Sequence, residues 1–279
     1  MAKSHKTSMV MGTRTVWMFL TAIYLLLQAS LSAFATTIVA ILEEKSITIA
    51  ADGIMTGKSK KSGNLVSNPA CKIRCFDRLC FAAAGRYSAK TIEYNLFKLV
   101  DKELDRPRTL KEASEHFKNV LSPLIPKIAA VAKKETPDWY AKWLKGMPML
   151  AYLFAGFDTN GKSLIVNSVV RIDSEGRALP IEESTRRGEF GPPEALSFGN
   201  NERIVNFMDR HPGWPIAASS DPVEFAERMI RIEIQASEIE GRRDVGEPIS
   251  IVRLKDKAAY NVERMGNCRS QQVRGNQSD

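Results

Sequence analysis

Two apolar runs that follow residue 35 have the pattern of paired, buried strands. Thr36–Leu42 and Ser46–Ala51 are β-branched and apolar at successive positions, which is typical of strands covered on both faces. If the short segment between the runs forms a two-residue hairpin loop, Thr37 pairs with Asp52. The pattern therefore predicts that Asp52 lies beside Thr36. Neither loop residue, Glu44 or Lys45, is favoured in a type I′ turn, so a register shifted by one residue stays open.

A second hairpin is predicted over Cys71–Phe76 and Leu79–Ala84, with another two-residue loop between them. Counting outward from this loop on both strands pairs Lys72 with Ala83. It leaves Gly85 just past the level of Lys72. We therefore expect Lys72 and Gly85 at one end of this strand pair.

The rest of the chain alternates helical and strand patterns. Apolar spacing predicts helices over Ala89–Leu104 and Leu110–Lys133, the second kinked or ended by its prolines. Further helices are predicted over Asn201–Asp209 and over Val223–Ile239, which Asp221 and Pro222 cap. The strand patterns cover Met147–Phe157, Ser163–Ile172, Ala195–Phe198 and Ile249–Leu254.

This order of elements predicts an α+β fold. Two central sheets with helices outside them, a four-layer αββα sandwich, would cover both apolar faces of each sheet. There is no internal repeat and no linker long enough to divide the chain. We therefore expect one domain over residues 36–265 and a disordered polar tail over 266–279.

The segment before Thr36 has the order of a secretory signal peptide. Met1–Thr15 is basic, Val16–Leu27 is almost continuously apolar, and Gln28–Ala35 is small and polar with an Ala-Phe-Ala end. Cleavage after those small residues would make Thr36 the new N-terminus of a periplasmic or secreted protein. The apolar core has about a dozen residues, against about 20 for a spanning helix, and an uncleaved membrane anchor stays open as the alternative. Residues 1–35 are therefore read as a signal peptide.

Composition narrows the function classes. Charged residues make up 26% and hydrophobic residues 44% of the chain, which excludes a disordered class. The net charge of +8 includes Lys3, Lys6 and Arg14 of the leader, and no basic run is interleaved with aromatic residues, so we expect no nucleic-acid partner. Of three histidines one lies in the leader, so we expect no metal, no cofactor and no Ser-His-Asp triad. Contact with a membrane is expected only through an uncleaved leader.

Residues 36–52, TTIVAILEEKSITIAAD, resemble the start of mature proteasome β-type subunits and of the related bacterial two-component peptidase subunit. These proteins belong to the N-terminal nucleophile (Ntn) hydrolases. Their mature chains begin with a threonine, and an aspartate follows at the separation of Thr36 and Asp52. The family's Lys-Ile/Leu step matches at Lys72, and its Ala-Gly step matches at Gly85. The resemblance runs from Thr36 to about Leu254.

Later segments resemble the family with two departures. Ala155–Gly161 is similar to the family's strand and turn, and Asp244 stands in its Arg-Asp pair. Asn200 replaces a serine of the family's Gly-Ser-Gly loop. Val245 occupies the neighbourhood of a second serine that follows Arg-Asp. Both serines help to hold the terminal amine in the family, so the departures bear on how the amine would be placed here.

The resemblance implies threonine-nucleophile chemistry. The Thr36 hydroxyl would attack, and the free α-amine of the same residue would take its proton. That amine has an unperturbed pKa of about 7.7–8, and the nearby Lys72 ammonium would lower this pKa and keep the amine neutral. Asp52 would pair with Lys72 and hold its charge in place.

The remaining candidate residues would stabilise charge and orient the amine. Gly85 would offer a backbone N–H to the oxyanion, and Asn200 and Asp244 would orient the amine. The predicted reaction is hydrolysis of an amide or peptide bond through an acyl-enzyme, with a peptide or a small amide as substrate. The family's ring assemblies imply a homo-oligomer.

Two other functions stay open. The first is a catalytically inactive proteasome-like subunit that serves as an assembly or binding module, for which Val245 is the best support. The second is a membrane-tethered protein with an intact leader, whose Thr36 is blocked. Within the enzymes, an acylase acting on a small amide is the alternative to a peptidase.

Four cysteines lie after the leader, at Cys71, Cys75, Cys80 and Cys268. Their spacing fits no zinc site. Export would permit a disulfide, and Cys75 and Cys80 would be diagonal or adjacent across the second hairpin. We expect buried free thiols.

Overall fold

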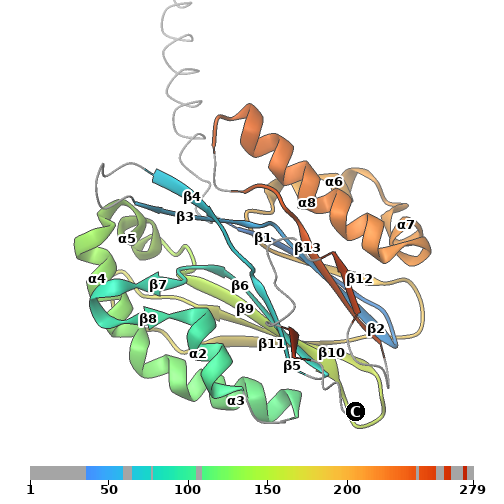
Figure 1. The fold of residues 1–279 in the computed structure, drawn as a ribbon, viewed down its shortest axis with the longest axis horizontal. Helices are drawn as coiled ribbons and strands as arrows, with labels where there is room; N and C mark the ends of the chain where they lie inside the picture. Colours follow the sequence, from blue (N-terminus) through green and yellow to red (C-terminus); the bar gives the residue numbers. More distant parts are fainter. Residues whose placement is uncertain are drawn as a thin grey trace, which may run out of the picture. The chain divides into compact units, whose positions relative to one another are not determined.

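The fold comes from a computed structural model that describes residues 36–58, 65–76, 78–104, 109–242, 245–255, 261–264 and 273–274 (Figure 1). The predicted signal peptide, residues 1–35, lies outside the described residues. The described part is a mixed α+β structure with two large sheets.

The larger strands are β1 (Thr37–Leu42), β2 (Ser46–Ala51), β5 (Ile73–Phe76), β6 (Leu79–Gly85), β9 (Leu150–Phe157), β10 (Ser163–Val170), β11 (Glu182–Arg187), β12 (Glu194–Gly199) and β13 (Ser250–Lys255). The peripheral strands are β3 (Ile54–Lys58), β4 (Leu65–Pro69), β7 (Ser88–Ala89), β8 (Tyr94–Asn95), β14 (Asn261–Arg264) and β15 (Val273–Arg274). The helices are α2 (Leu96–Glu103), α3 (Leu110–Leu121), α4 (Ile125–Glu135), α5 (Pro137–Leu144), α6 (Glu202–Arg210), α7 (Trp214–Ser220) and α8 (Pro222–Ile239), with 3-10 turns η1 (Lys90–Ile92) and η2 (Ser122–Leu124).

The two large sheets mix strands from distant parts of the chain. The five-stranded sheet has the order β12-β1-β2-β13-β14, and the six-stranded sheet has the order β11-β10-β9-β6-β5-β15. In the first sheet, β1 and β2 occupy inner positions between strands that come some 150 residues later or more. The N-terminal hairpin therefore depends on the C-terminal half for its partners.

Three hydrophobic clusters account for the faces of these sheets. One cluster joins residues of both sheets, including Ile38 of β1 and Ala82 of β6. A second packs the six-stranded sheet against α2–α5, and a third packs the five-stranded sheet against α6–α8 (Figure 1). Along β1, Ile38 belongs to the first cluster and Val39 to the third. Alternate residues of a strand point to opposite faces, so the strand is apolar on both, as its sequence predicts.

Both predicted hairpins form in the expected register. In the β1–β2 pair Ile38 lies opposite Ala51, which places Thr37 level with Asp52, and Asp52 N donates to Thr37 O at 3.2 Å. In the β5–β6 pair Phe76 lies opposite Leu79. Two-residue loops fix the register of a hairpin, so the sequence alone predicted which residues pair in these two hairpins.

The helix predictions are confirmed in part. The prolines of Leu110–Lys133 do interrupt it, because η2 separates α3 from α4. The single helix predicted over Ala89–Leu104 is wrong in its first half, where β7, η1 and β8 precede α2. Glu93 adopts a φ of 54°, which stops a right-handed helix, and the Asn95 side chain then caps α2 by accepting from Lys98 N at 3.0 Å. Helices α5 and α7 and strands β3, β4 and β11 were not predicted.

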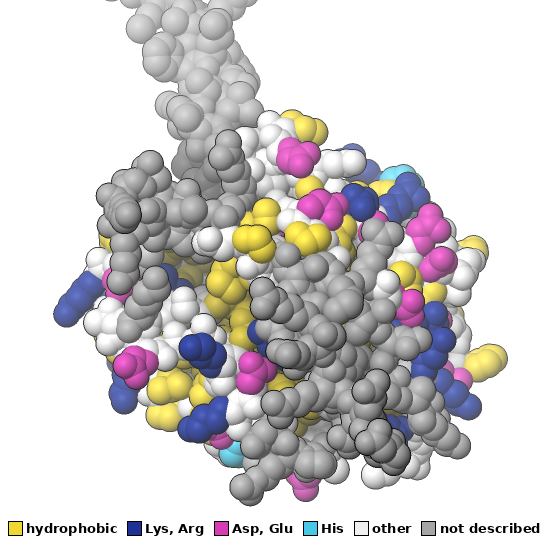
Figure 2. Space-filling view, viewed as in Figure 1, with side chains coloured by type: hydrophobic (Ala, Val, Ile, Leu, Met, Phe, Trp, Pro, Cys, Tyr) yellow, Lys and Arg dark blue, Asp and Glu magenta, His cyan; other side chains and the backbone are white. Residues whose placement is uncertain are grey.

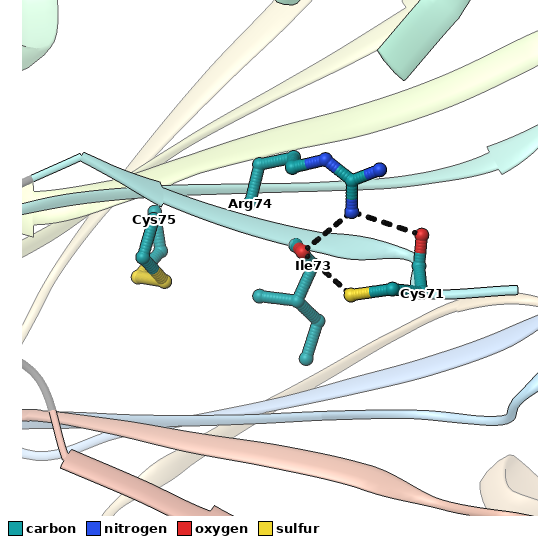
Figure 3. Close-up of a disulfide and its surroundings, with 5 residues drawn as sticks. Cys71, Ile73, Arg74 and Cys75 are labelled. Atoms are coloured by element: carbon teal, nitrogen blue, oxygen red, sulfur yellow. Dashed lines mark hydrogen bonds between the residues drawn. A yellow bond between two sulfur atoms is a disulfide. The ribbon is translucent and has the colours of Figure 1, made fainter. Parts of the chain in front are cut away.

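The expectation of free thiols is wrong for all three described cysteines, Cys71, Cys75 and Cys80, because each is disulfide-bonded. Cys75 and Cys80 bond to each other. These residues lie directly opposite each other in the β5–β6 pair, with Cα atoms 4.1 Å apart, and form a disulfide (Figure 3). The adjacent register brings the two sulfur atoms together, whereas the diagonal one would not. Among the described cysteines none is free. On the same strand the Arg74 guanidinium donates to the carbonyls of Cys71 and Ile73, at 3.2 and 3.1 Å.

Two residues of the tail predicted to be disordered have a strand partner. Val273 and Arg274 form β15 and pair in parallel with Cys75 and Phe76. The other residues of 266–279 lie outside the described part. Within the described ranges, no helix has both the length and the apolar character of a membrane span.

Candidate functional site

The β1–β2 hairpin brings Asp52 to the backbone of the first described residues. Thr37 N donates to Asp52 Oδ1 at 2.7 Å, next to the strand hydrogen bond from Asp52 N to Thr37 O. Thr36, Thr37 and Asp52 are all buried. The predicted nucleophile and the predicted aspartate are therefore joined through one peptide unit.

Lys72 completes an ion pair with this aspartate. Its Nζ lies 2.9 Å from both Asp52 Oδ1 and Oδ2, and both side chains are fully buried. Ile54 N adds a further hydrogen bond to Oδ2, at 3.2 Å. Burial raises the pKa of Asp52 above its usual value of 3.8, while the Lys72 ammonium and the two backbone N–H groups oppose that shift. The carboxylate thus holds the Lys72 ammonium and the Thr37 backbone at once.

The end of β12 clamps the backbone of Thr36 and Thr37 from the other side. Asn200 N donates to Thr36 O at 2.7 Å, and Thr37 Oγ1 donates to Asn200 O at 2.7 Å. Gly199 has a φ of 84°, and a Cβ there would lie 1.9 Å from Thr36 O, so the close approach needs a glycine. Asn200 therefore reaches the site through its main chain.

The Asn200 side chain points to a residue that the sequence did not indicate. With the amide oriented so that both groups are satisfied, its oxygen accepts from the Arg242 guanidinium, 3.2 Å from Nη2. The Asn200 amide that replaces the family's serine thus pairs with a cation.

Gly85 ends β6 in a conformation that other residues rarely adopt. Its φ is 119°, and a Cβ would lie 2.6 Å from Met149 O. Arg86 N donates to the same carbonyl at 3.0 Å, which fixes the turn that follows Gly85. The glycine is required by the backbone whether or not its N–H binds a ligand.

Tyr87 is a site residue that sequence analysis missed. Its phenol oxygen is hydrogen-bonded to Thr36 Oγ1 and, at 2.8 Å, to Ala83 O. Ala83 is the residue predicted to lie level with Lys72. The only signal in the sequence is that Tyr87 follows Gly85 by two residues, and no pattern shows that its side chain turns back to β1.

The segment that contains the last predicted site residue is only partly described. Asp244 lies outside the described residues. Val245 is buried among the apolar side chains that pack on α8, and Gly246 O accepts from Gly53 N at 2.9 Å. The chain around Val245 therefore reaches the residue that follows Asp52.

Comparison with known proteins adds little to this geometry. Neither a protein-family model nor a curated protein matches the chain. Among solved structures, the chain is similar to a Gly-1 mutant of Anbu from Hyphomicrobium sp. strain MC1, with 14% sequence identity and a TM-score of 0.43 over 82% of this chain and 85% of that one. A TM-score this low carries no argument, so the case rests on the residues themselves.

The candidate site brings together polar groups of three kinds. In the described ranges no group of three or more histidine, cysteine or acidic side chains is placed to hold a metal ion. A hydroxyl, a buried ammonium and a buried carboxylate instead converge on one strand end. Buried ionisable groups with shifted pKa values are typical of functional sites, although structural ion pairs also occur.

Proposed function

We propose that this protein is an exported Ntn hydrolase that cleaves an amide or peptide bond through Thr36. The observation that carries the proposal is the buried Lys72–Asp52–Thr37 chain of contacts, 2.9 and 2.7 Å long, at the end of β1. A fully buried ion pair contributes little to stability compared with apolar packing, so a chemical role explains it better than a structural one. The three hydrophobic clusters support the corresponding αββα sandwich.

The reaction begins with removal of residues 1–35, which frees the α-amine of Thr36. The Thr36 hydroxyl then attacks the substrate carbonyl and gives its proton to that amine. The Lys72 ammonium, held by Asp52, favours the neutral form of the amine before the attack. The Gly85 N–H receives the oxyanion. The amine passes the proton to the leaving amine, which leaves Thr36 acylated on its oxygen.

Water completes the cycle. The neutral α-amine removes a proton from a water molecule that attacks the ester, and the proton returns to Thr36 Oγ1 as the acid product leaves. The substrate under this proposal is a peptide or a small amide, and neither a metal nor a cofactor takes part. A homo-oligomer is part of the proposal only through the family resemblance.

One feature supports the exported location, and another describes the charge on part of the surface. The Cys75–Cys80 disulfide suits an oxidising compartment such as the periplasm or the cell exterior. On the face drawn in Figure 2, the described Lys and Arg side chains are interspersed with Asp and Glu and form no continuous basic surface.

An inactive assembly or binding module is the second candidate. Val245 favours it, because a buried apolar residue stands where the family has a serine that helps to hold the amine. Labelling of Thr36 separates the two candidates.

The test starts from the full gene expressed in a secreting host. We expect intact mass and N-terminal sequencing to give a chain that begins at Thr36. That chain should gain the mass of one β-lactone, which acylates a nucleophilic hydroxyl. Thr36→Ala should abolish the mass gain, and Thr48→Ala, which changes a buried threonine of β2 outside the site, should keep it. Unlabelled Thr36 in a chain that begins there would favour the inactive module.

A further inference from the structure

The proposed mechanism does not use Tyr87, although Tyr87 contacts the proposed nucleophile. The Tyr87 phenol is hydrogen-bonded to Thr36 Oγ1 and to Ala83 O, and its side chain is buried. Its role can be derived from the direction of these two hydrogen bonds.

The direction follows from the donors and acceptors present. A phenol has one proton, and a backbone carbonyl can only accept. Tyr87 therefore donates to Ala83 O. The remaining hydrogen bond then runs from the Thr36 hydroxyl to the Tyr87 oxygen. In this direction the Tyr87 contact takes up no lone pair of Thr36 Oγ1, whereas a bond donated by Tyr87 would occupy one.

The Tyr87 ring is held rigidly. The ring stacks on Phe97 of α2, with ring centroids 5.3 Å apart. The Arg74 guanidinium of β5 lies 4.8 Å from the centroid of the same Phe97 ring. Leu96 N donates to Tyr87 O at 2.8 Å and fixes its main chain. A rigid acceptor restricts a neighbouring threonine to the side-chain rotamer that can reach it.

We infer that Tyr87 is a positioning residue of the proposed nucleophile: it holds Thr36 Oγ1 in one rotamer, and the proton of that hydroxyl turns from Tyr87 toward the α-amine only as attack begins. The inference rests on the proposed function. Burial raises the pKa of Tyr87 well above its usual value, so the phenol stays neutral and does not take the proton itself. Only the O–H bond of Thr36 has to turn at the moment of attack.

The test compares two matched variants of the mature chain that begins at Thr36. Tyr87→Phe removes the phenol that contacts Thr36. Tyr94→Phe is the control, because Tyr94 is equally buried and its phenol donates to Arg86 O at 3.3 Å, outside the mechanism. The rate of covalent labelling by a β-lactone is followed against its concentration, which separates the limiting rate constant from the half-saturation concentration. Thermal unfolding of both variants is measured in parallel.

We expect Tyr87→Phe to lower the limiting rate constant by roughly 3- to 10-fold, the equivalent of one ordinary hydrogen bond. The half-saturation concentration and the pH at which the rate is half-maximal should stay the same, because neither binding nor the amine changes. Tyr94→Phe should label like the wild type. A general loss of packing would instead lower Tm in both variants and slow both reactions.

Each other outcome overturns the inference. If wild type and Tyr87→Phe label equally fast, Thr36 is positioned without Tyr87, and the proposed function still stands. If Tyr87→Phe labels faster, the contact restrains the nucleophile and does not position it. If a wild-type chain that begins at Thr36 is not labelled at all, the proposed function fails and the role of Tyr87 fails with it.

Discussion

Asp52 links the charge of the site to the position of the nucleophile. One of its oxygens accepts from both Thr37 N and Lys72 Nζ, so the ammonium and the start of β1 share a single anchor. A substitution of Asp52 or Lys72 therefore affects the backbone position of Thr37 as well as the electrostatics of the site.

A double-mutant cycle over Asp52 and Lys72 should separate stability from chemistry. Asp52→Asn leaves the Lys72 ammonium buried without its counter-charge, and it should lower the free energy of unfolding by about 3–5 kcal/mol. Adding Lys72→Met removes the buried charge and should restore most of that loss, while β-lactone labelling stays low in every variant. Urea denaturation of the four proteins measures the coupling. Additive losses would show that the two side chains do not depend on each other.

The sequence could place some of these residues but not others. Thr37 and Asp52 follow from the first hairpin, and the level of Lys72 follows from the second, because two-residue loops dictate which residues pair. That Lys72 meets Asp52 followed only from the family resemblance. Tyr87 and Arg242 depend on how a loop and a helix end approach the sheet after it has formed. Side-chain contacts of that kind leave no period in the sequence.

At the scale of elements, α8 supplies the cap of α6. Glu233 of α8 is fully buried, and its Oε1 accepts from Arg203 N at 2.7 Å and Ile204 N at 3.3 Å in the first turn of α6. The residue before α6, Asn201, makes no side-chain capping bond of its own. The first turn of α6, which follows the Asn200 loop, therefore relies on a carboxyl group from another helix.

Glu233 should make stability depend on pH. Burial raises the pKa of Glu233 above its usual value of 4.5, so the folded chain binds its proton more tightly than the unfolded chain does. The stabilisation is complete below pH 4.5 and declines as the pH rises through the raised pKa. Glu233→Gln keeps an acceptor but does not titrate, so its stability relative to the wild type should improve from pH 4.5 to 8. Urea denaturation across this range provides the measurement.

Glu233→Ala serves as the contrast to that variant. It leaves two backbone donors of α6 without their acceptor, which should cost about 1–3 kcal/mol at every pH in the range. If Glu233→Gln instead loses stability relative to the wild type as the pH rises, the fold prefers the carboxylate form of Glu233. The raised pKa assigned to Glu233 is then wrong.

The helix prediction over Ala89–Leu104 failed in its first half, because buried residues there have helical spacing without forming a helix. Ala89, Tyr94, Phe97 and Val100 are all buried in one cluster, and their spacing resembles one face of a helix. The chain between Ala89 and Phe97 nevertheless passes through two short strands and a residue with positive φ. Periodicity records which residues are buried, and it cannot distinguish a helix from an irregular segment that packs the same residues.

At the scale of the whole molecule, the proposed chemistry requires that Thr36 is the N-terminal residue. One additional glycine before Thr36 turns its amine into an amide, which cannot accept a proton. We expect such a chain to unfold at the same temperature as the mature form, because Thr36 O and Thr37 N keep their bonds to Asn200 and Asp52. Its β-lactone labelling should be slower by roughly 10²–10⁴-fold, the usual contribution of a general base.

The measurement compares this extended chain with the same protein cut to begin at Thr36. Equal labelling rates would mean that another group acts as the base. The sequence could foresee the importance of this terminus from the leader alone. It could not foresee the order of strands in the sheets, because no local pattern pairs β1 with β12 or β2 with β13.

That strand order also has a consequence for the timing of folding. The hairpin that carries Thr36 and Asp52 is synthesised well before its neighbours on both sides, Glu194–Gly199 and Ser250–Lys255. Pairing across such sequence separations is slow, and it cannot begin until the late strands exist. A nascent chain that has not reached β13 thus contains Thr36, Asp52 and Lys72, but the candidate site is not yet assembled. The topology itself delays assembly of the candidate site until the chain has been made as far as Lys255.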